Sequence, residues 1–82
     1  MIPRTILRLW AVTQETGYSR STLYTRINEK LWTKPVKLGA RAIGWPADEV
    51  AALNAARIAG MTDFDIEALV GRLEASRARC DQ

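Results

Sequence analysis

The turn at Gly17 to Ser19, placed between two segments with helical spacing of apolar residues, constrains the fold of this chain more than any other feature. Glycine readily adopts the left-handed backbone that ends a helix, and a serine oxygen can accept hydrogen bonds from the amides that open the next helix. Leu23 and Ile27 lie four residues apart, so they share one face of that second helix. The pattern predicts two short helices joined by a tight turn, at Trp10–Thr16 and Ser19–Lys30.

The face of the second predicted helix opposite Leu23 carries short hydroxyl side chains, Ser21 and Thr25, with Arg20 in the first turn and Tyr24 on a flank. A helix face in contact with water usually carries long charged residues, so this face suits close contact with another polar polymer. The second helix of a helix-turn-helix meets DNA in this way. The alternative is an ordinary helical hairpin, because Ser and Thr are also common at helix starts as caps.

Charge is distributed unevenly along the 82 residues. Residues 1–45 contain eight Lys or Arg and two Glu, a net charge of +6, whereas residues 46–82 contain four Arg and seven Asp or Glu, a net charge of −3. A basic segment of this size attracts polyanions and indicates a nucleic-acid surface in the N-terminal half. The alternative is the solvated surface of a small basic protein.

The composition argues against several other classes of protein. Cys80 is the only cysteine and there is no histidine, so we expect no disulfide, no metal centre and no other cofactor, and we assign Cys80 no chemistry. Without a Ser/His or Cys/His pair or a glycine-rich phosphate loop, we expect no enzyme. Nothing near Met1 resembles a secretion signal, and no segment approaches the ~20 apolar residues of a membrane span, so we expect a cytoplasmic protein.

The segments on either side of the two helices have β character. Thr5–Leu9 is expected to be extended, as a short strand, and Trp10 after it is interpreted as a packing residue. In Lys34–Trp45, apolar residues alternate with polar ones before and after a Gly-Ala pair, which predicts a short hairpin. Its cations, Lys37 and Arg41, can reach phosphates across a groove. The alternative is an edge hairpin protected from aggregation by its lysine.

Two further helices are predicted after the hairpin. Pro46 suits the start of the first, Ala47–Ala59, and Thr62 caps the second, whose tail from Glu74 to Gln82 is expected to fray. The last helix carries an apolar stripe, formed by Ile66, Leu69, Val70 and Leu73. The stripe must be covered, either by folding back on the preceding helix or by dimerisation with a second copy. We therefore divide the chain into residues 1–60 and a C-terminal helix, residues 61–82, for packing or dimerisation.

In this order the segments resemble the AlpA family of prophage-type regulators, which lie near the excisionases and the MerR-like winged helix-turn-helix proteins. The residues that carry the resemblance, within Arg4 to Ile58, are Arg8-Leu9, Gly17 to Tyr24, Lys34 to Gly39 and Ile43 to Trp45. The sequence departs from the family pattern after the second helix, where Trp32-Thr33-Lys34-Pro35 replaces the usual Phe-Pro. The helix from Thr62 onward lies outside the shared motif.

The resemblance implies a winged helix-turn-helix with a short β-hairpin wing. With the two C-terminal helices predicted above, we expect a mainly α fold. The resemblance also implies contacts to bases or phosphates from the second helix and contacts to phosphates from the wing. The residues implied are Arg20, Ser21, Tyr24 and Thr25 on the helix and Lys37 and Arg41 on the wing.

We therefore expect a sequence-specific protein of a mobile element that binds double-stranded DNA and regulates transcription or integrase-mediated excision. One module makes few contacts, so a homodimer or cooperative copies on repeated sites are expected, with integrase or RNA polymerase as further partners. The alternative from a different class is a protein–protein adaptor that docks through the C-terminal apolar stripe.

Overall fold

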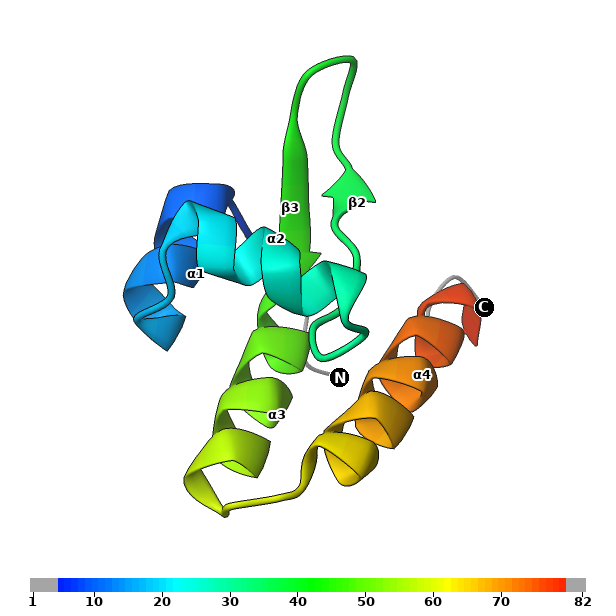
Figure 1. The fold of residues 1–82 in the computed structure, drawn as a ribbon. Coiled ribbons are helices and arrows are strands. Elements are labelled where there is room, and N and C mark those ends of the chain that lie inside the picture. Colours follow the sequence, from blue (N-terminus) through cyan, green and yellow to red (C-terminus); the bar gives the residue numbers. More distant parts are fainter. Residues whose placement is uncertain (1–4, 80–82) are drawn as a thin grey trace.

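In the computed structural model, which describes residues 5–79, four helices pack around a small antiparallel sheet (Figure 1). The helices are α1 (Leu9–Thr16), α2 (Arg20–Asn28), α3 (Ala47–Ile58) and α4 (Asp63–Arg79). The strands are β1 (Ile6–Leu7), β2 (Val36–Lys37) and β3 (Ile43–Pro46), in the order β1-β3-β2. This arrangement confirms the predicted mainly α, winged helix-like fold. The expectations for Met1 to Arg4 and for Cys80 lie outside the described residues.

The turn between α1 and α2 forms as predicted. Gly17 has φ 77°, in the left-handed region, and its amide donates to the Thr13 carbonyl at 2.9 Å, which ends α1. Ser19 is the N-cap of α2, and its Oγ accepts a hydrogen bond from the Thr22 amide at 3.2 Å. A cap of this kind contributes about 1 kcal/mol to helix stability. The sequence therefore defines both helix ends at this turn.

The far end of α2 is ordered, and the helix ends at Asn28 rather than at the predicted Lys30. The Lys30 amide donates to the Ile27 carbonyl at 3.0 Å, and the Leu31 amide donates to the Arg26 carbonyl at 2.8 Å. These are the two hydrogen bonds of a Schellman motif. Lys30 takes the left-handed position with φ 64°, which glycine usually fills. The motif turns the chain so that Leu31 is buried.

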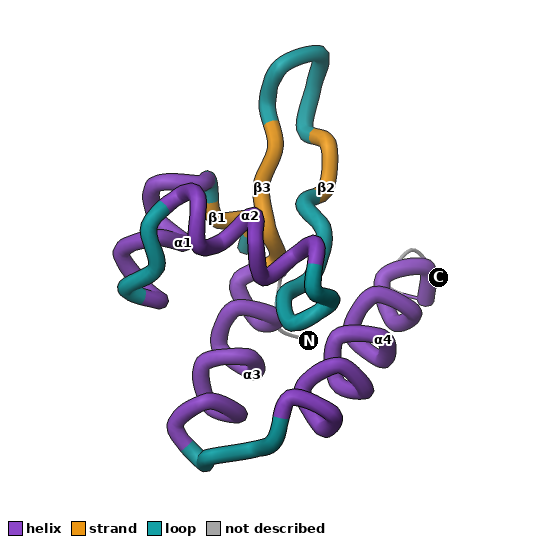
Figure 2. The backbone as a smooth tube through the Cα atoms, in the orientation of Figure 1, coloured by secondary structure: helices purple, strands orange, loops and turns teal. Residues whose placement is uncertain are grey.

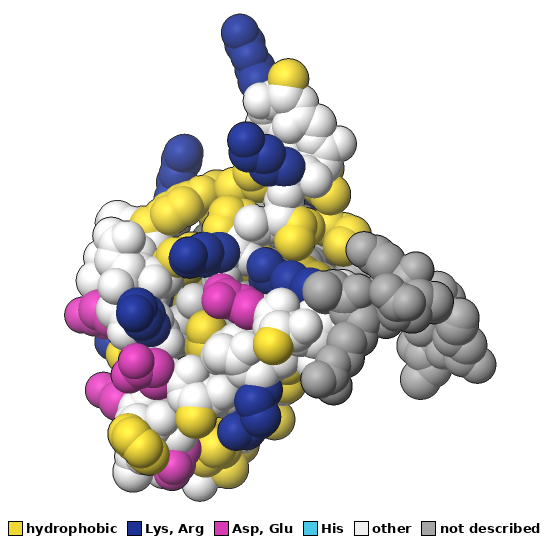
Figure 3. Space-filling model, turned by 90° about the vertical axis from the view of Figure 1, so that its right-hand side faces the viewer, with side chains coloured by type: hydrophobic (Ala, Val, Ile, Leu, Met, Phe, Trp, Pro, Cys, Tyr) yellow, Lys and Arg dark blue, Asp and Glu magenta, His cyan; other side chains and the backbone are white. Residues whose placement is uncertain are grey.

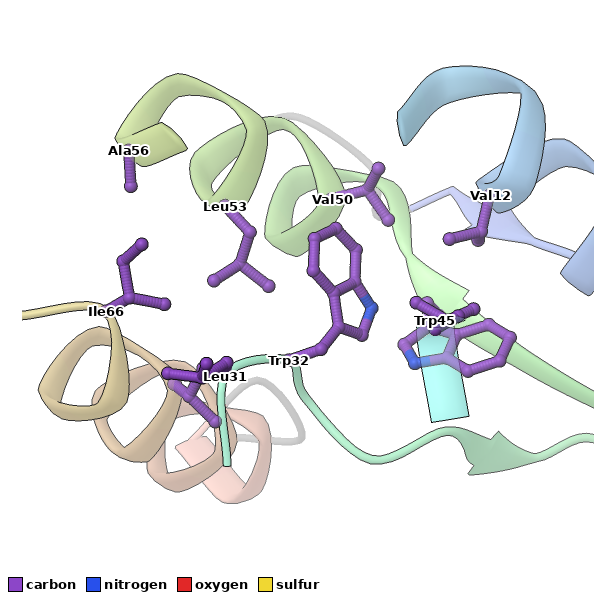
Figure 4. Packing of buried hydrophobic residues seen from close by; sticks show 10 residues of the cluster. Val12, Leu31, Trp32, Trp45, Val50, Leu53, Ala56 and Ile66 are labelled. Carbon is purple, nitrogen blue, oxygen red and sulfur yellow. The ribbon is translucent and has the colours of Figure 1, made fainter. Parts of the chain in front are cut away.

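A single hydrophobic core joins all four helices to the sheet (Figure 4). Its buried members are Val12, Leu23, Leu31, Trp32, Trp45, Val50, Leu53, Ala56, Ile66 and Val70. Trp32 is a core residue, and it points toward Val50 and Leu53 of α3. Trp45 of β3 is fully buried, and its indole Nε1 donates to the Thr33 carbonyl at 2.9 Å. The two indoles therefore fix the chain between α2 and the sheet.

The apolar stripe of α4 is covered by the chain itself. Ile66 and Val70 are 1% and 4% exposed, and Leu69 and Leu73 are partly buried against the same core. Of the two alternatives for this stripe, the fold uses the first, packing against α3 (Figure 2). A dimer contact through Ile66 and Val70 would require α4 to leave the core. Residues on both sides of the division at residue 60 therefore share one core.

The sheet carries the hairpin away from the helices (Figure 2). β1 pairs with β3 so that Leu7 lies opposite Trp45, and β2 pairs with β3 so that Lys37 lies opposite Ile43. Both pairings are antiparallel. Because Trp45 is anchored in the core, the hairpin projects as a wing from a fixed base.

An ion pair and hydrogen bonds hold the C-terminal part of α4. The prediction that the tail from Glu74 frays is therefore wrong for the described residues. Arg77 donates to both carboxylate oxygens of Glu49, from Nε at 2.8 Å and from Nη2 at 2.7 Å. Its Nη2 also donates to the Lys34 carbonyl at 2.6 Å, while the Lys34 amide donates to Glu74 at 2.8 Å. Glu49 lies in the first turn of α3 and is fully buried, paired with Arg77 of α4.

We expect Arg77→Ala to lower the free energy of unfolding by about 3 kcal/mol, because a buried carboxylate loses a bidentate partner. Arg72→Ala on the exposed side of the same helix is the matched control, with an expected change below about 0.5 kcal/mol. Urea denaturation followed by circular dichroism measures both. Equal losses in the two variants would contradict the importance of the Glu49 contact.

Gly44 is required where β1 and the wing approach each other. A Cβ at this position would lie 2.5 Å from Ile6 Cγ2 and 2.9 Å from the Leu7 carbonyl oxygen, whereas a Cβ at Gly39 would meet nothing within 4 Å. We therefore expect Gly44→Ala to lower the free energy of unfolding by roughly 1–3 kcal/mol and Gly39→Ala to leave it nearly unchanged. Thermal unfolding of the two variants tests this, and a Gly44→Ala protein as stable as Gly39→Ala would refute it.

Candidate nucleic-acid interface

The side of α2 that faces away from the core is the predicted hydroxyl face. Leu23 is fully buried on the inner side. On the outer side Arg20, Ser21 and Thr25 are exposed, and Tyr24 is half-buried. Ser21 and Thr25 are short, so the backbone of α2 can come close to a flat or grooved partner.

The hydroxyl groups of α2 leave hydrogen-bond acceptors on the surface. Thr25 Oγ1 donates to the Ser21 carbonyl at 2.9 Å, and Ser19 Oγ donates to Thr22 Oγ1 at 2.9 Å. A hydroxyl that has donated its proton keeps lone pairs as acceptors, and threonine keeps its methyl group. Thr25 therefore offers an acceptor for base amino groups and an apolar contact for a thymine methyl.

Two arginines of α2 are restrained by neighbouring tyrosine rings. The Arg20 guanidinium carbon lies 6.0 Å from the centroid of the Tyr24 ring, and that of Arg26 lies 5.9 Å from the Tyr18 ring. Both distances suit a cation–π interaction. Arg26 also forms an ion pair with Glu29 at 3.3 Å, so part of its charge is neutralised within the helix. Of these two arginines, Arg20 is therefore the one whose positive charge lies on the exposed face of α2.

The wing is basic along its whole length. Lys37 of β2 and Arg41 of the tip are both exposed, and the sequence from Lys30 to Ala47 contains no acidic residue. On the face shown in Figure 3 the charged side chains of the wing are all Lys or Arg, whereas acidic side chains lie lower, over the helices. The two cations predicted for the wing therefore stand on a ribbon without neutralising carboxylates.

A hollow of about 620 Å³ lies where the start of α1, the start of α2 and the wing meet. We call it the arginine hollow, and it is lined by Arg8, Trp10, Arg20, Tyr24 and Arg41 together with Leu9 and Ile43. It brings three of the predicted site residues together from two separate elements. Ser21, Thr25 and Lys37 are exposed outside its lining.

Two residues of this hollow, Arg8 and Trp10, were not predicted as part of the site. Trp10 is 71% exposed, so its interpretation as a packing residue is wrong. Helical spacing contains the signal that was missed, because Leu9 and Val12 point inward and Trp10 lies about 100° around the helix from Leu9. This spacing indicates that Trp10, two residues after Arg8, lies on the surface of α1.

Among residues 5–79, no three His, Cys, Asp or Glu side chains gather in a way that would hold a metal ion. None of the described helices combines the length and the apolar character needed to cross a membrane.

A helix-turn-helix with an exposed hydroxyl face, beside a projecting basic hairpin, places this protein in the class of small winged helix-like proteins. A family model described as "Prophage CP4-57 regulatory protein (AlpA)" matches residues 5–57. The chain belongs to this AlpA family of prophage regulatory proteins, as the resemblance in sequence indicated. No curated protein and no solved structure matches the chain. The family region contains α1, α2, the wing and nearly all of α3, and α4 lies outside it.

Proposed function

We propose that this protein binds double-stranded DNA in a sequence-specific way, with α2 in the major groove and the wing along the neighbouring backbone. The observation that carries the proposal is that the exposed hydroxyl face of α2 adjoins the acid-free wing, with Arg20 and Arg41 lining one hollow. A groove-binding helix needs short side chains for close approach, and phosphate contacts need cations on either side. Both requirements are met by the same surface.

Each residue of the surface has a role suited to its chemistry. Arg20 reads guanine edges, because a guanidinium can donate two hydrogen bonds to guanine O6 and N7. Ser21 and Thr25 approach bases at the centre of the helix, and Tyr24 donates its hydroxyl to a phosphate. Lys37 and Arg41 contact phosphates from the wing.

As a member of a prophage regulator family, the protein would use this binding to control transcription or integrase-mediated excision in a mobile element. Both uses begin with the same bound site, and they differ in whether RNA polymerase or an integrase is the partner. A single module makes few contacts, so we propose that several copies bind repeated sites. Because Ile66 and Val70 are buried, such copies would meet through another surface or through the spacing of their sites.

No observation favours the adaptor alternative, because the apolar stripe on which it depends packs into the core. The proposed role is that of a binding protein rather than an enzyme.

Selection of bound sequences from a random pool of DNA duplexes tests the proposal directly. We expect a short enriched sequence, repeated at a fixed spacing if several copies bind together. A pool that shows no enrichment after repeated rounds, with no measurable duplex affinity, would contradict the proposed function.

Arg20→Ala is expected to lower affinity for the selected duplex by about 1–3 kcal/mol and to leave affinity for a random duplex nearly unchanged, because base contacts carry the sequence preference. Fluorescence anisotropy with both labelled duplexes measures the ratio. Arg72→Ala, an exposed substitution on α4, serves as the charge-matched control. Equal losses of Arg20→Ala on the two duplexes would assign Arg20 to the backbone instead.

Arg41→Ala is expected to weaken binding to selected and random duplexes alike, because its contact is to phosphate. The slope of log affinity against log salt should become shallower by about 0.9, the contribution of one released counterion. Titrations at four or more salt concentrations determine this slope. An unchanged slope would show that the wing tip does not touch the backbone.

A further inference from the structure

We infer that the start of α1 forms a third DNA contact, in which Arg8 and Trp10 hold one strand's sugar–phosphate backbone in the arginine hollow. This inference rests on the proposed function and extends it to a part of the fold outside α2 and the wing. It assigns the phosphate to Arg8, next to the wing contact of Arg41, and the deoxyribose to the exposed indole of Trp10, while Arg20 keeps its proposed contact to bases.

The charge of the hollow is the first argument. Arg8, Arg20 and Arg41 come from three separate segments and line one hollow, and none of the described residues that line it is acidic. Guanidinium groups gathered in this way favour an anionic ligand, and Arg8 and Arg41 are available for phosphate oxygens when Arg20 contacts a base. The volume of about 620 Å³ is sufficient for a nucleotide-sized portion of a strand.

The exposure of Trp10 is the second argument. The chain has three tryptophans, of which Trp32 and Trp45 are 2% and 0% exposed and Trp10 is 71% exposed. Trp10 also lines a neighbouring hollow of about 590 Å³, so the indole belongs to the walls of two depressions. A free phosphate ion would leave this apolar ring in water. A sugar–phosphate strand would cover it, because deoxyribose has apolar faces.

The position of the hollow is the third argument. Its lining includes Arg20 and Tyr24 from α2 and Arg41 from the wing. α2 and the wing are the two elements proposed to contact DNA. A strand that passes from the groove occupied by α2 to the phosphates beside the wing must therefore cross the arginine hollow. The backbone at the start of α1 is fixed there, because the Val12 amide donates to the Arg8 carbonyl at 3.0 Å.

Tryptophan fluorescence tests this contact apart from affinity, since Trp10 is the only one of the three indoles that is exposed. Addition of the selected duplex to the full chain should change the emission and protect the exposed indole from quenching by acrylamide. Trp10→Phe should still bind the duplex but lose the DNA-dependent change in emission. If the duplex binds the wild-type chain and acrylamide still reaches Trp10 fully, the inference is overturned while the proposed function stands.

Affinity measurements complete the test. Trp10→Ala should weaken binding roughly five- to tenfold on selected and random duplexes alike, whereas Phe64→Ala, an equally exposed aromatic on α4, should change nothing. Arg8→Ala should make the salt slope shallower by about 0.9. A Trp10→Ala loss confined to the selected duplex would overturn the backbone assignment, as would equal protection of Trp10 by polyglutamate. Failure of the wild-type chain to bind any duplex would instead refute the proposed function itself.

Discussion

The short segment between α2 and β2 is the constraint on which the rest of the structure depends, because it sets the position of α2 relative to the wing. It is held at three successive residues. Trp32 is buried in the core, the Thr33 carbonyl accepts a hydrogen bond from Trp45, and the backbone of Lys34 is bonded to both Glu74 and Arg77. A connection with so many fixed atoms cannot act as a hinge, so α2 and the wing behave as one rigid surface.

The contacts of this segment also show how α4 contributes to the fold. The family region ends at residue 57, yet two side chains of α4 supply the hydrogen bonds that hold Lys34. The same helix covers the core with Ile66 and Val70 and partners the buried Glu49. α4 is therefore part of the scaffold that orients the candidate interface, although it carries none of the residues proposed to touch DNA.

The sequence predicted the local features of this fold well, because they depend on few residues. Gly17, Ser19 and the spacing of Leu23 were sufficient to define the turn and the inner face of α2. The end of α2 was missed because Lys30 occupies the left-handed position without the glycine that normally marks it. The ion pair of Glu49 with Arg77 was missed because it joins residues 28 positions apart, and no periodic pattern encodes such a contact.

For the candidate site, too, local features were predicted and long-range contacts were missed. Residues on the exposed face of α2 and on the wing were identified from their type and position along one element. The arginine hollow was not, because its arginines meet only after the sheet has brought the wing beside α1 and α2. Trp10 was misassigned because aromatic residues are more often buried than exposed.

The uneven distribution of charge has a consequence for how the protein reaches a polyanion. Residues 46–82 carry a net charge of −3, and the start of α4, where Asp63 is paired with Arg57 and Asp65 is exposed, lies at the end of the molecule opposite the wing tip (Figure 1). Lys37 and Arg41 lie on the wing. The chain is therefore an electric dipole as well as a net cation. In the field of a duplex such a molecule rotates during diffusion so that the wing leads, which reduces the orientational search before the first collision.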